Sequence, residues 1–191
     1  RTLSEMPYAT EVVRFSPGEN AGFGEPEFPE VVLGPPKGGG NENGSLHVLS
    51  LGGGGEIVLG FGDRKIVNGE GPDFVVFENP FAIGGDEENP FAELAEISVS
   101  SDGESWVSFD CDGGTEYPWP GCAGWQLVSP FNGCVSAIDP LLTGGDLFDL
   151  EDIGVNEVRF IRITDLASSG SAPSAGFDLD AIGIFNVVKT F

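Results

Sequence analysis

The stretch GPDFVVFENPF, from Gly71 to Phe81, decides the fold class, because it is a short apolar run bounded by turn-forming residues. A second stretch of the same kind, GFDLDAIGIF, extends from Gly176 to Phe185. Runs rich in Val, Ile and Phe that lie between Gly, Pro, Asn and Asp are typical of β-strands. Few segments of the chain are rich in helix formers. We therefore expect an all-β protein.

Further strands are predicted outward from these two stretches. ISVSSDGESWVSF, residues 97–109, predicts two alternating strands joined at Asp102–Gly103, because Asp-Gly is a strong hairpin signal. NEVRFIRITDL, residues 156–166, predicts another alternating strand, with three candidate core residues, Val158, Phe160 and Ile163. The turn-rich segment 1–30 contains one obvious strand, VVRF at 12–15, and is expected to be a linker or a strand donated to a neighbour.

Length and composition suit one domain over residues 1–191. The chain has a mass of 20.0 kDa, and 40% of its residues are hydrophobic, which suffices for a sizeable core. Thirty Gly and 14 Pro indicate many tight turns. Short strands separated by such turns predict a single β-sandwich with long loops and at most short helical turns.

The charge balance excludes two classes of partner. Asp and Glu number 31 against 8 Lys and Arg, giving a formal net charge of −23. Nucleic-acid binding needs clustered basic residues, and so does binding to anionic membrane surfaces. No apolar run approaches the roughly 20 residues that span a bilayer, so no membrane insertion is expected. Solvation accounts for most of the acids.

The chain begins with Arg1 rather than Met, so we expect a secreted protein whose signal peptide has been removed. In an oxidising compartment one pair of its three cysteines forms a disulfide, and the expected pair is Cys111 with Cys122. Cys134 then stays free or pairs elsewhere. The single histidine, His47, and the absence of a Cys-x-x-Cys motif argue against zinc.

The acids inside the apolar stretches predict a calcium site. A buried carboxylate is costly without a partner, and basic residues are too few to supply one each. Calcium binds six to eight oxygens from carboxylates, amides, carbonyls and water. Asp178 and Asp180 share one strand face, where their charges repel unless a cation lies between them. The candidate ligands are Asp73, Glu78, Asn79, Asp146, Asp149, Asp165, Asp178 and Asp180.

Each candidate group has a competing interpretation. Asp178 and Asp180 can both lie on a solvated face, where salt screens their repulsion. Asp73 can cap the Gly-Pro turn that precedes it, and Asp146 or Asp149 can cap a short helix. A weaker set on a turn is expected to be solvated, namely Asp63, Asn68 and Glu70.

The loop aromatics Tyr117, Trp119 and Trp125 suggest a second function, because exposed rings of a β-sandwich can stack on sugars. Alternatively they pack over the disulfide and cover one end of the core. Paired carboxylates can also make a glycosidase, but pairs arise by chance among so many acids. His47 has no Gly-x-Ser-x-Gly elbow to serve, so no catalytic residue is assigned.

Two sets of motifs resemble known families. ISVSSDGESWVSF and VRFIRITDL are similar to the strand pair of discoidin-type domains, which have the galactose-binding-like jelly-roll fold. Over residues 31–186, the motifs VVLGPP, SLGGGGEIVLGFG, GPDFVVFENPF, ISVSSDGESW, GCAG, GGDLFDLEDIG, VRFIRITD and GFDLDAIGIFN resemble, in this order, bacterial cell-surface proteins of uncharacterised function. The resemblance implies an extracellular jelly-roll domain and no defined activity. Those proteins often have Cys where this chain has Gly53, so their cysteine pairing does not transfer.

Together these observations predict a calcium-binding structural or adhesive domain, extracellular or at a bacterial cell surface. Its expected partners are further copies of itself, assembling into a larger array, or matrix glycans. The alternative is a carbohydrate-binding module that uses the loop aromatics, and a less favoured alternative is a glycoside hydrolase that uses paired carboxylates.

Overall fold

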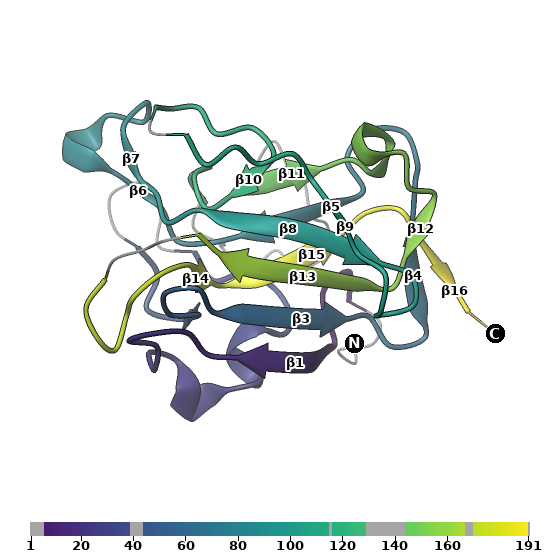
Figure 1. Ribbon diagram of the computed structural model, residues 1–191, viewed down its shortest axis with the longest axis horizontal. Coiled ribbons are helices and arrows are strands. Elements are labelled where there is room, and N and C mark those ends of the chain that lie inside the picture. Colours follow the sequence, from purple (N-terminus) through teal and green to yellow (C-terminus); the bar gives the residue numbers. More distant parts are fainter. Residues whose placement is uncertain (1–5, 39–43, 115, 129–143, 167–169, 191) are drawn as a thin grey trace.

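The computed structural model of the chain describes residues 6–38, 44–114, 116–128, 144–166 and 170–190. Within these ranges short antiparallel strands alternate with long loops (Figure 1). Helical elements here are 3-10 turns, η2 (Glu25–Glu27), η3 (Glu30–Val32), η4 (Ile83–Gly85) and η5 (Leu150–Ile153). None of the helices in these ranges is long and apolar enough to cross a bilayer. Cys134 lies outside the described residues.

One layer is a six-stranded sheet, whose central strands lie side by side in Figure 1. All its pairings are antiparallel, and β9 extends it by pairing with β8. The order of the other five strands is β1 (Glu11–Ser16), β3 (Glu56–Gly60), β13 (Phe160–Asp165), β8 (Ala95–Ser100) and β10 (Cys122–Ala123), with β9 at Val107–Ser108. The segment 1–30 thus places β1 in the sheet of its own chain.

The remaining strands form small sheets. The order in the first is β11 (Asp146–Phe148), β5 (Phe74–Phe77) and β15 (Ala181–Ile184), and in the second β12 (Glu157–Val158), β4 (Arg64–Val67) and β16 (Val187–Lys189). Two pairs complete the fold, β2 (Leu49–Ser50) with β14 (Asp178–Leu179), and β6 (Phe81–Ala82) with β7 (Pro90–Phe91). The β6–β7 pair projects from one end of the molecule (Figure 1).

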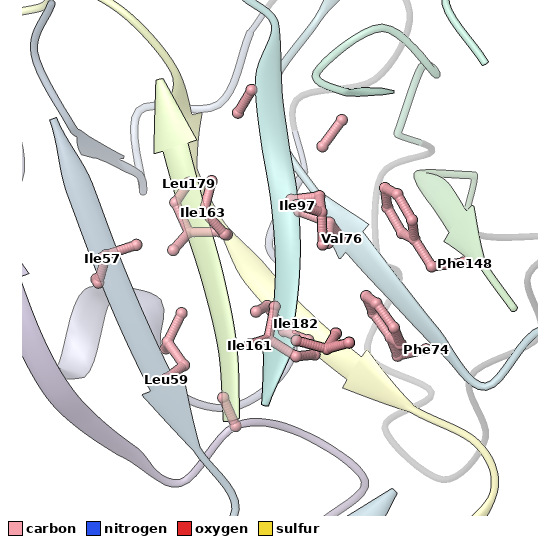
Figure 2. Close-up of a cluster of buried hydrophobic side chains, with 14 of the residues drawn as sticks. Ile57, Leu59, Phe74, Val76, Ile97, Phe148, Ile161, Ile163, Leu179 and Ile182 are labelled. Atoms are coloured by element: carbon pink, nitrogen blue, oxygen red, sulfur yellow. The ribbon is translucent and has the colours of Figure 1, made fainter. Parts of the chain in front are cut away.

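The core lies between the six-stranded sheet and β5 with its neighbours (Figure 2). Strand β5 is buried along its whole length, as expected for an apolar run bounded by turn-forming residues. Its Phe74 stacks on Phe148, with ring centroids 5.1 Å apart. Figure 2 shows how both sheets contribute aliphatic side chains to this layer, including Ile57, Ile97, Ile161, Ile163 and Ile182. The all-β sandwich predicted from the sequence is confirmed.

Local predictions mostly agree with the structure. The β8–β9 hairpin is confirmed, and Oδ1 of Asp102 accepts the backbone amides of Glu104 and Ser105 in its turn. One core assignment was wrong. Phe160 is only half-buried, whereas Ile161 and Ile163 are fully buried. Alternation along a strand puts residues two apart on the same face, so Phe160 and Ile163 cannot share the core face.

Candidate metal centre

Three carboxylates from distant parts of the sequence meet at one end of the sandwich. Glu78 directly follows β5, Glu93 lies between β7 and β8, and Asp178 begins β14. One oxygen from each of these residues lies within 4.8 Å of the others. Calcium–oxygen distances of about 2.3–2.6 Å put oxygens on opposite sides of an ion about 5 Å apart. The spacing of the cluster therefore fits one shared calcium ion.

Hydrogen bonds orient two members of the cluster. The backbone amide of Asp178 donates to Oε1 of Glu78 at 3.3 Å. Asp178 accepts the hydroxyl of Ser50 on Oδ1, and the Asn79 amide lies 3.5 Å from its Oδ2. The same Asn79 amide donates to the carbonyl of Ser45 at 2.9 Å. Asn79, a predicted ligand, thus turns its amide nitrogen toward the cluster and acts to orient Asp178.

The second oxygen of Glu78 is left without a partner. Glu78 is 2% exposed, and its Oε2 has no hydrogen-bond partner among the residues that the structure describes. A buried carboxylate oxygen that lacks a donor is destabilising, because it has lost water and gained nothing. Oε2 therefore marks a place where a proton or a cation belongs.

The carboxylates of the cluster hold protons more tightly than exposed acids do. Burial, and then the charges of Asp178 and Glu93, raise the pKa of Glu78 well above its ordinary value. Burial, and then Asp178 and Asp165, raise the pKa of Glu93 to about 8. Burial raises the pKa of Asp178 to about 6. A divalent cation would reverse these shifts, because it stabilises the charged form of every ligand.

An open groove of about 680 Å³ lies over the cluster. Glu93 and Asp178 line it, whereas Glu78 does not and lies beneath. Its wall includes Phe81 and Phe91, which stack with ring centroids 5.2 Å apart and planes 12° from parallel. The groove lining thus combines two acids with a stacked aromatic pair.

Four other predicted ligands lie outside this cluster, and their carboxylates accept hydrogen bonds from backbone amides. Asp73 accepts the amides of Gly69 and Leu150, both at 2.9 Å, and the side-chain amide of Asn186 at 2.8 Å. Its contact with Gly69 spans the Gly71–Pro72 turn, in keeping with the alternative capping role. Asp146, Asp165 and Asp180 are bound in the same way, the first by Gly124, the second by Gly54 and Phe177, and the third by Lys37 and Gly38.

Asp178 and Asp180 do not come together in one site. β14 ends at Leu179 and β15 begins at Ala181, and the two strands pair with different partners. Asp178 faces Glu78, whereas Asp180 is 1% exposed and accepts backbone amides. Neither lies on the solvated face that the alternative required. Asp149 caps η5 by accepting the amide of Glu151 at 2.9 Å, as its alternative role predicted.

Glu93 is the member of the cluster that was not predicted from the sequence. It lies in FAELAEISV, which resembles an ordinary alternating strand with polar residues outward. Its cluster partners are far away in the chain, so no local motif marks it. Its only sequence signal is the position at a strand entry, which does not distinguish it from other acids.

The loop aromatics lie together beside the disulfide. The Cys111–Cys122 bond is formed, as predicted. Tyr117, Trp119 and Trp125 contact one another edge to face, with centroids 5.6–6.5 Å apart. The Trp125 indole donates to the carbonyl of Cys122 at 3.0 Å. The three rings thus pack on one another beside the disulfide loop, and Tyr117 is 41% exposed.

Neither a protein-family model nor a curated protein matches the sequence. Two solved structures show low similarity. The C-terminal domain of a chitobiase from Bacteroides fragilis is 13% identical with a TM-score of 0.35, over 71% of this chain and 65% of that one. A glycoside hydrolase is 14% identical with a TM-score of 0.36, over 74% of this chain and 22% of that one. The chain spans less than two thirds of the length of each of these two proteins.

Proposed function

We propose that the protein is an extracellular β-sandwich domain that binds calcium through Glu78, Glu93 and Asp178. The observation that carries the proposal is the buried Oε2 of Glu78, which has no partner among the described residues and belongs to the three-carboxylate cluster. The extracellular location is supported by the Cys111–Cys122 disulfide, because such bonds persist in oxidising compartments.

Calcium suits this cluster better than zinc does. The cluster offers carboxylate oxygens alone, which are the donors that calcium prefers, whereas zinc sites use mainly His and Cys. Ca²⁺ also tolerates flexible geometry and a mixture of protein and water ligands. An ion here would join the end of β5, the β7–β8 connection and β14. Its role is therefore structural, holding three loops at one end of the sandwich.

Catalysis by the same carboxylates is a weaker interpretation. A glycosidase needs two carboxyl groups that both reach the scissile bond. Glu78 is 2% exposed and does not line the groove, so it cannot reach a substrate there. The cluster as a whole is better placed to hold an ion than to act on a bound ligand.

Within this proposal the biological role is structural or adhesive. The groove adjoins the ion site, so calcium would fix the loops that shape a surface for contact. Size-exclusion chromatography with and without calcium tests self-assembly. An elution volume that shifts toward larger species in calcium supports an array, and one that stays at the monomer position in both conditions counts against assembly.

Thermal unfolding tests the ion site itself. With a Kd of about 10⁻⁴ M, at the tight end of the range for extracellular modules, 10 mM calcium adds about 2.7 kcal/mol of stability. For a chain of this size that corresponds to a rise in Tm of about 5–10 °C. Chelation should reverse the rise, and Glu93→Gln should abolish most of it. Glu88→Gln, an exposed acid on the β6–β7 turn, is the matched control. A wild-type melting curve that calcium leaves unchanged would refute the proposal.

A further inference from the structure

The groove above the cluster has the chemistry of a sugar-binding site. We propose that it binds a neutral oligosaccharide, and that neighbouring hydroxyl groups of the sugar complete the coordination of the calcium ion. This inference rests on the proposed function, because it needs the ion in place. Such an oligosaccharide is then the partner to which the domain adheres.

The coordination geometry leaves room for a ligand on the groove side. Three carboxylates supply only part of the six to eight oxygens that calcium takes. Glu78 lies beneath the groove, while Glu93 and Asp178 line it. An ion held among them therefore has its remaining positions directed into the groove. A pair of adjacent hydroxyls is an oxygen donor set that can replace two water molecules there.

The charge of the site favours a neutral ligand. Three carboxylates and one divalent cation leave about one negative charge at the floor, and the whole chain carries a formal charge of −23. An anionic partner such as a polyuronate would be repelled over the whole surface. Hydroxyl groups are uncharged and lose less free energy on desolvation than carboxylates do.

The walls of the groove match the two kinds of surface that a sugar ring presents. Phe91 is 47% exposed and stacks on Phe81, which offers a flat apolar surface to the C–H face of a pyranose. Ser171 and Ser174 are exposed, also line the groove and supply hydroxyls for the polar edge of the ring. A mainly apolar wall with a few placed polar groups is typical of small-ligand sites.

A second hollow extends the site beyond one sugar. It has a volume of about 430 Å³ and shares Phe23 and Leu46 with the first groove, so the two adjoin. Leu46 is 85% exposed, which is unusual for a large aliphatic side chain and places apolar surface between the two hollows. His47 lines the second hollow. The combined surface suits an oligosaccharide rather than a single sugar.

Calorimetric titration with defined oligosaccharides tests the inference. The probes are cello-, xylo-, manno- and chito-oligosaccharides of six units, with a galacturonan fragment as the anionic comparison, each in 10 mM calcium and in chelator. We expect at least one neutral probe to bind in calcium and none in chelator. Phe91→Ala should weaken binding about tenfold, which corresponds to about 1.4 kcal/mol. Trp125→Ala, in the aromatic loop, should bind like the wild type.

Melting curves of the same variants separate this inference from the proposed function. Phe91→Ala should keep the full calcium-dependent rise in Tm, because the ring is no ligand of the ion, whereas Glu93→Gln should lose both the rise and sugar binding. If calcium raises the Tm but no neutral probe binds, the inference fails and the ion site stands. Binding that survives chelation, prefers the galacturonan or depends on Trp125 rather than Phe91 also overturns it. If calcium leaves the Tm unchanged, both proposals fail.

Discussion

The backbone amide of Asp178 donates to Oε1 of Glu78 at 3.3 Å, so the main chain itself sets two of the three clustered carboxylates side by side. Only Oε1 is used in this way, and the buried Oε2 has no partner among the described residues. A site whose ligands are held by the main chain requires little further ordering of the chain when it binds an ion.

Calcium binding should release protons near neutral pH. Glu93 has a pKa of about 8 and therefore carries a proton at pH 7 without an ion, and burial also raises the pKa of Glu78 well above its ordinary value. Because calcium needs the deprotonated carboxylates, its affinity should rise as pH increases from about 6 to 8. Calorimetry in two buffers with different protonation enthalpies measures the released protons. A binding enthalpy and an affinity that depend on neither buffer nor pH would contradict the prediction.

The calcium-free protein should lose stability as pH rises from about 4 to 8. Burial raises the pKa of Asp146 to about 7 and that of Asp180 to about 7, both from 3.8. The folded state therefore binds more protons than the unfolded state across this window, so the stabilisation is complete below about pH 4 and is lost by about pH 8. For Asp146 the shift corresponds to about 4 kcal/mol.

Urea unfolding in chelator at several pH values measures this dependence. Asp146→Asn removes one of the titrating groups and should flatten the decline in the free energy of unfolding with pH. Asp152→Asn, which removes an exposed carboxylate of η5, is the control and should leave the decline as in the wild type. A free energy of unfolding that increases steadily from pH 4 to 8 would contradict the prediction.

Gly124→Ala should destabilise the fold more than Gly54→Ala does. Both glycines have a positive φ, 98° at Gly124 and 72° at Gly54, which costs other residues about 1–3 kcal/mol. A Cβ at Gly124 would also lie 2.1 Å from the carbonyl oxygen of Glu93, whereas one at Gly54 meets nothing within 4 Å. The clash should displace the Glu93 segment as well, so calcium affinity should fall in Gly124→Ala alone. Equal losses of stability in urea unfolding would show that the contact with Glu93 is not tight.

Reduction of the disulfide should cost about 2–3 kcal/mol of stability. Cys111 and Cys122 close a short loop, and once the bond is reduced this loop gains conformational entropy in the unfolded chain. Urea unfolding with and without a phosphine reductant gives the value, and the double variant Cys111→Ser, Cys122→Ser should match the reduced wild type. Cys134→Ser should keep the full effect of the reductant. If the reductant no longer changes the stability of that variant, the stabilisation comes from a disulfide that involves Cys134.

The fold could be predicted from the sequence because its signals are local. Phe74–Phe77 is apolar throughout and became a fully buried strand, and Asp102–Gly103 formed the turn of a hairpin. Which face of β13 points into the core was harder to predict. Phe160 and Ile161 are both apolar, so residue type does not distinguish them, and the assignment depends on counting alternate positions from a residue known to be buried.

The site was harder to predict because its members are joined only in three dimensions. Glu78 and Asp178 were recognised as acids within apolar strands, whereas Glu93 has no such context. Buried acids need neither a basic residue nor a cation where backbone amides bind them. Asp73 and Asp165 obtain their hydrogen bonds from backbone amides, which composition does not count.

These amide-bound carboxylates connect buried segments of the chain without using charged groups of the surface. Asp165 connects Gly54 to Phe177, and Asp180 holds the chain at Lys37 and Gly38 beside β15. Each acts as an internal clasp between remote segments, and it needs no lysine or arginine to do so. The chain can therefore carry its formal net charge of −23 without losing these contacts between segments.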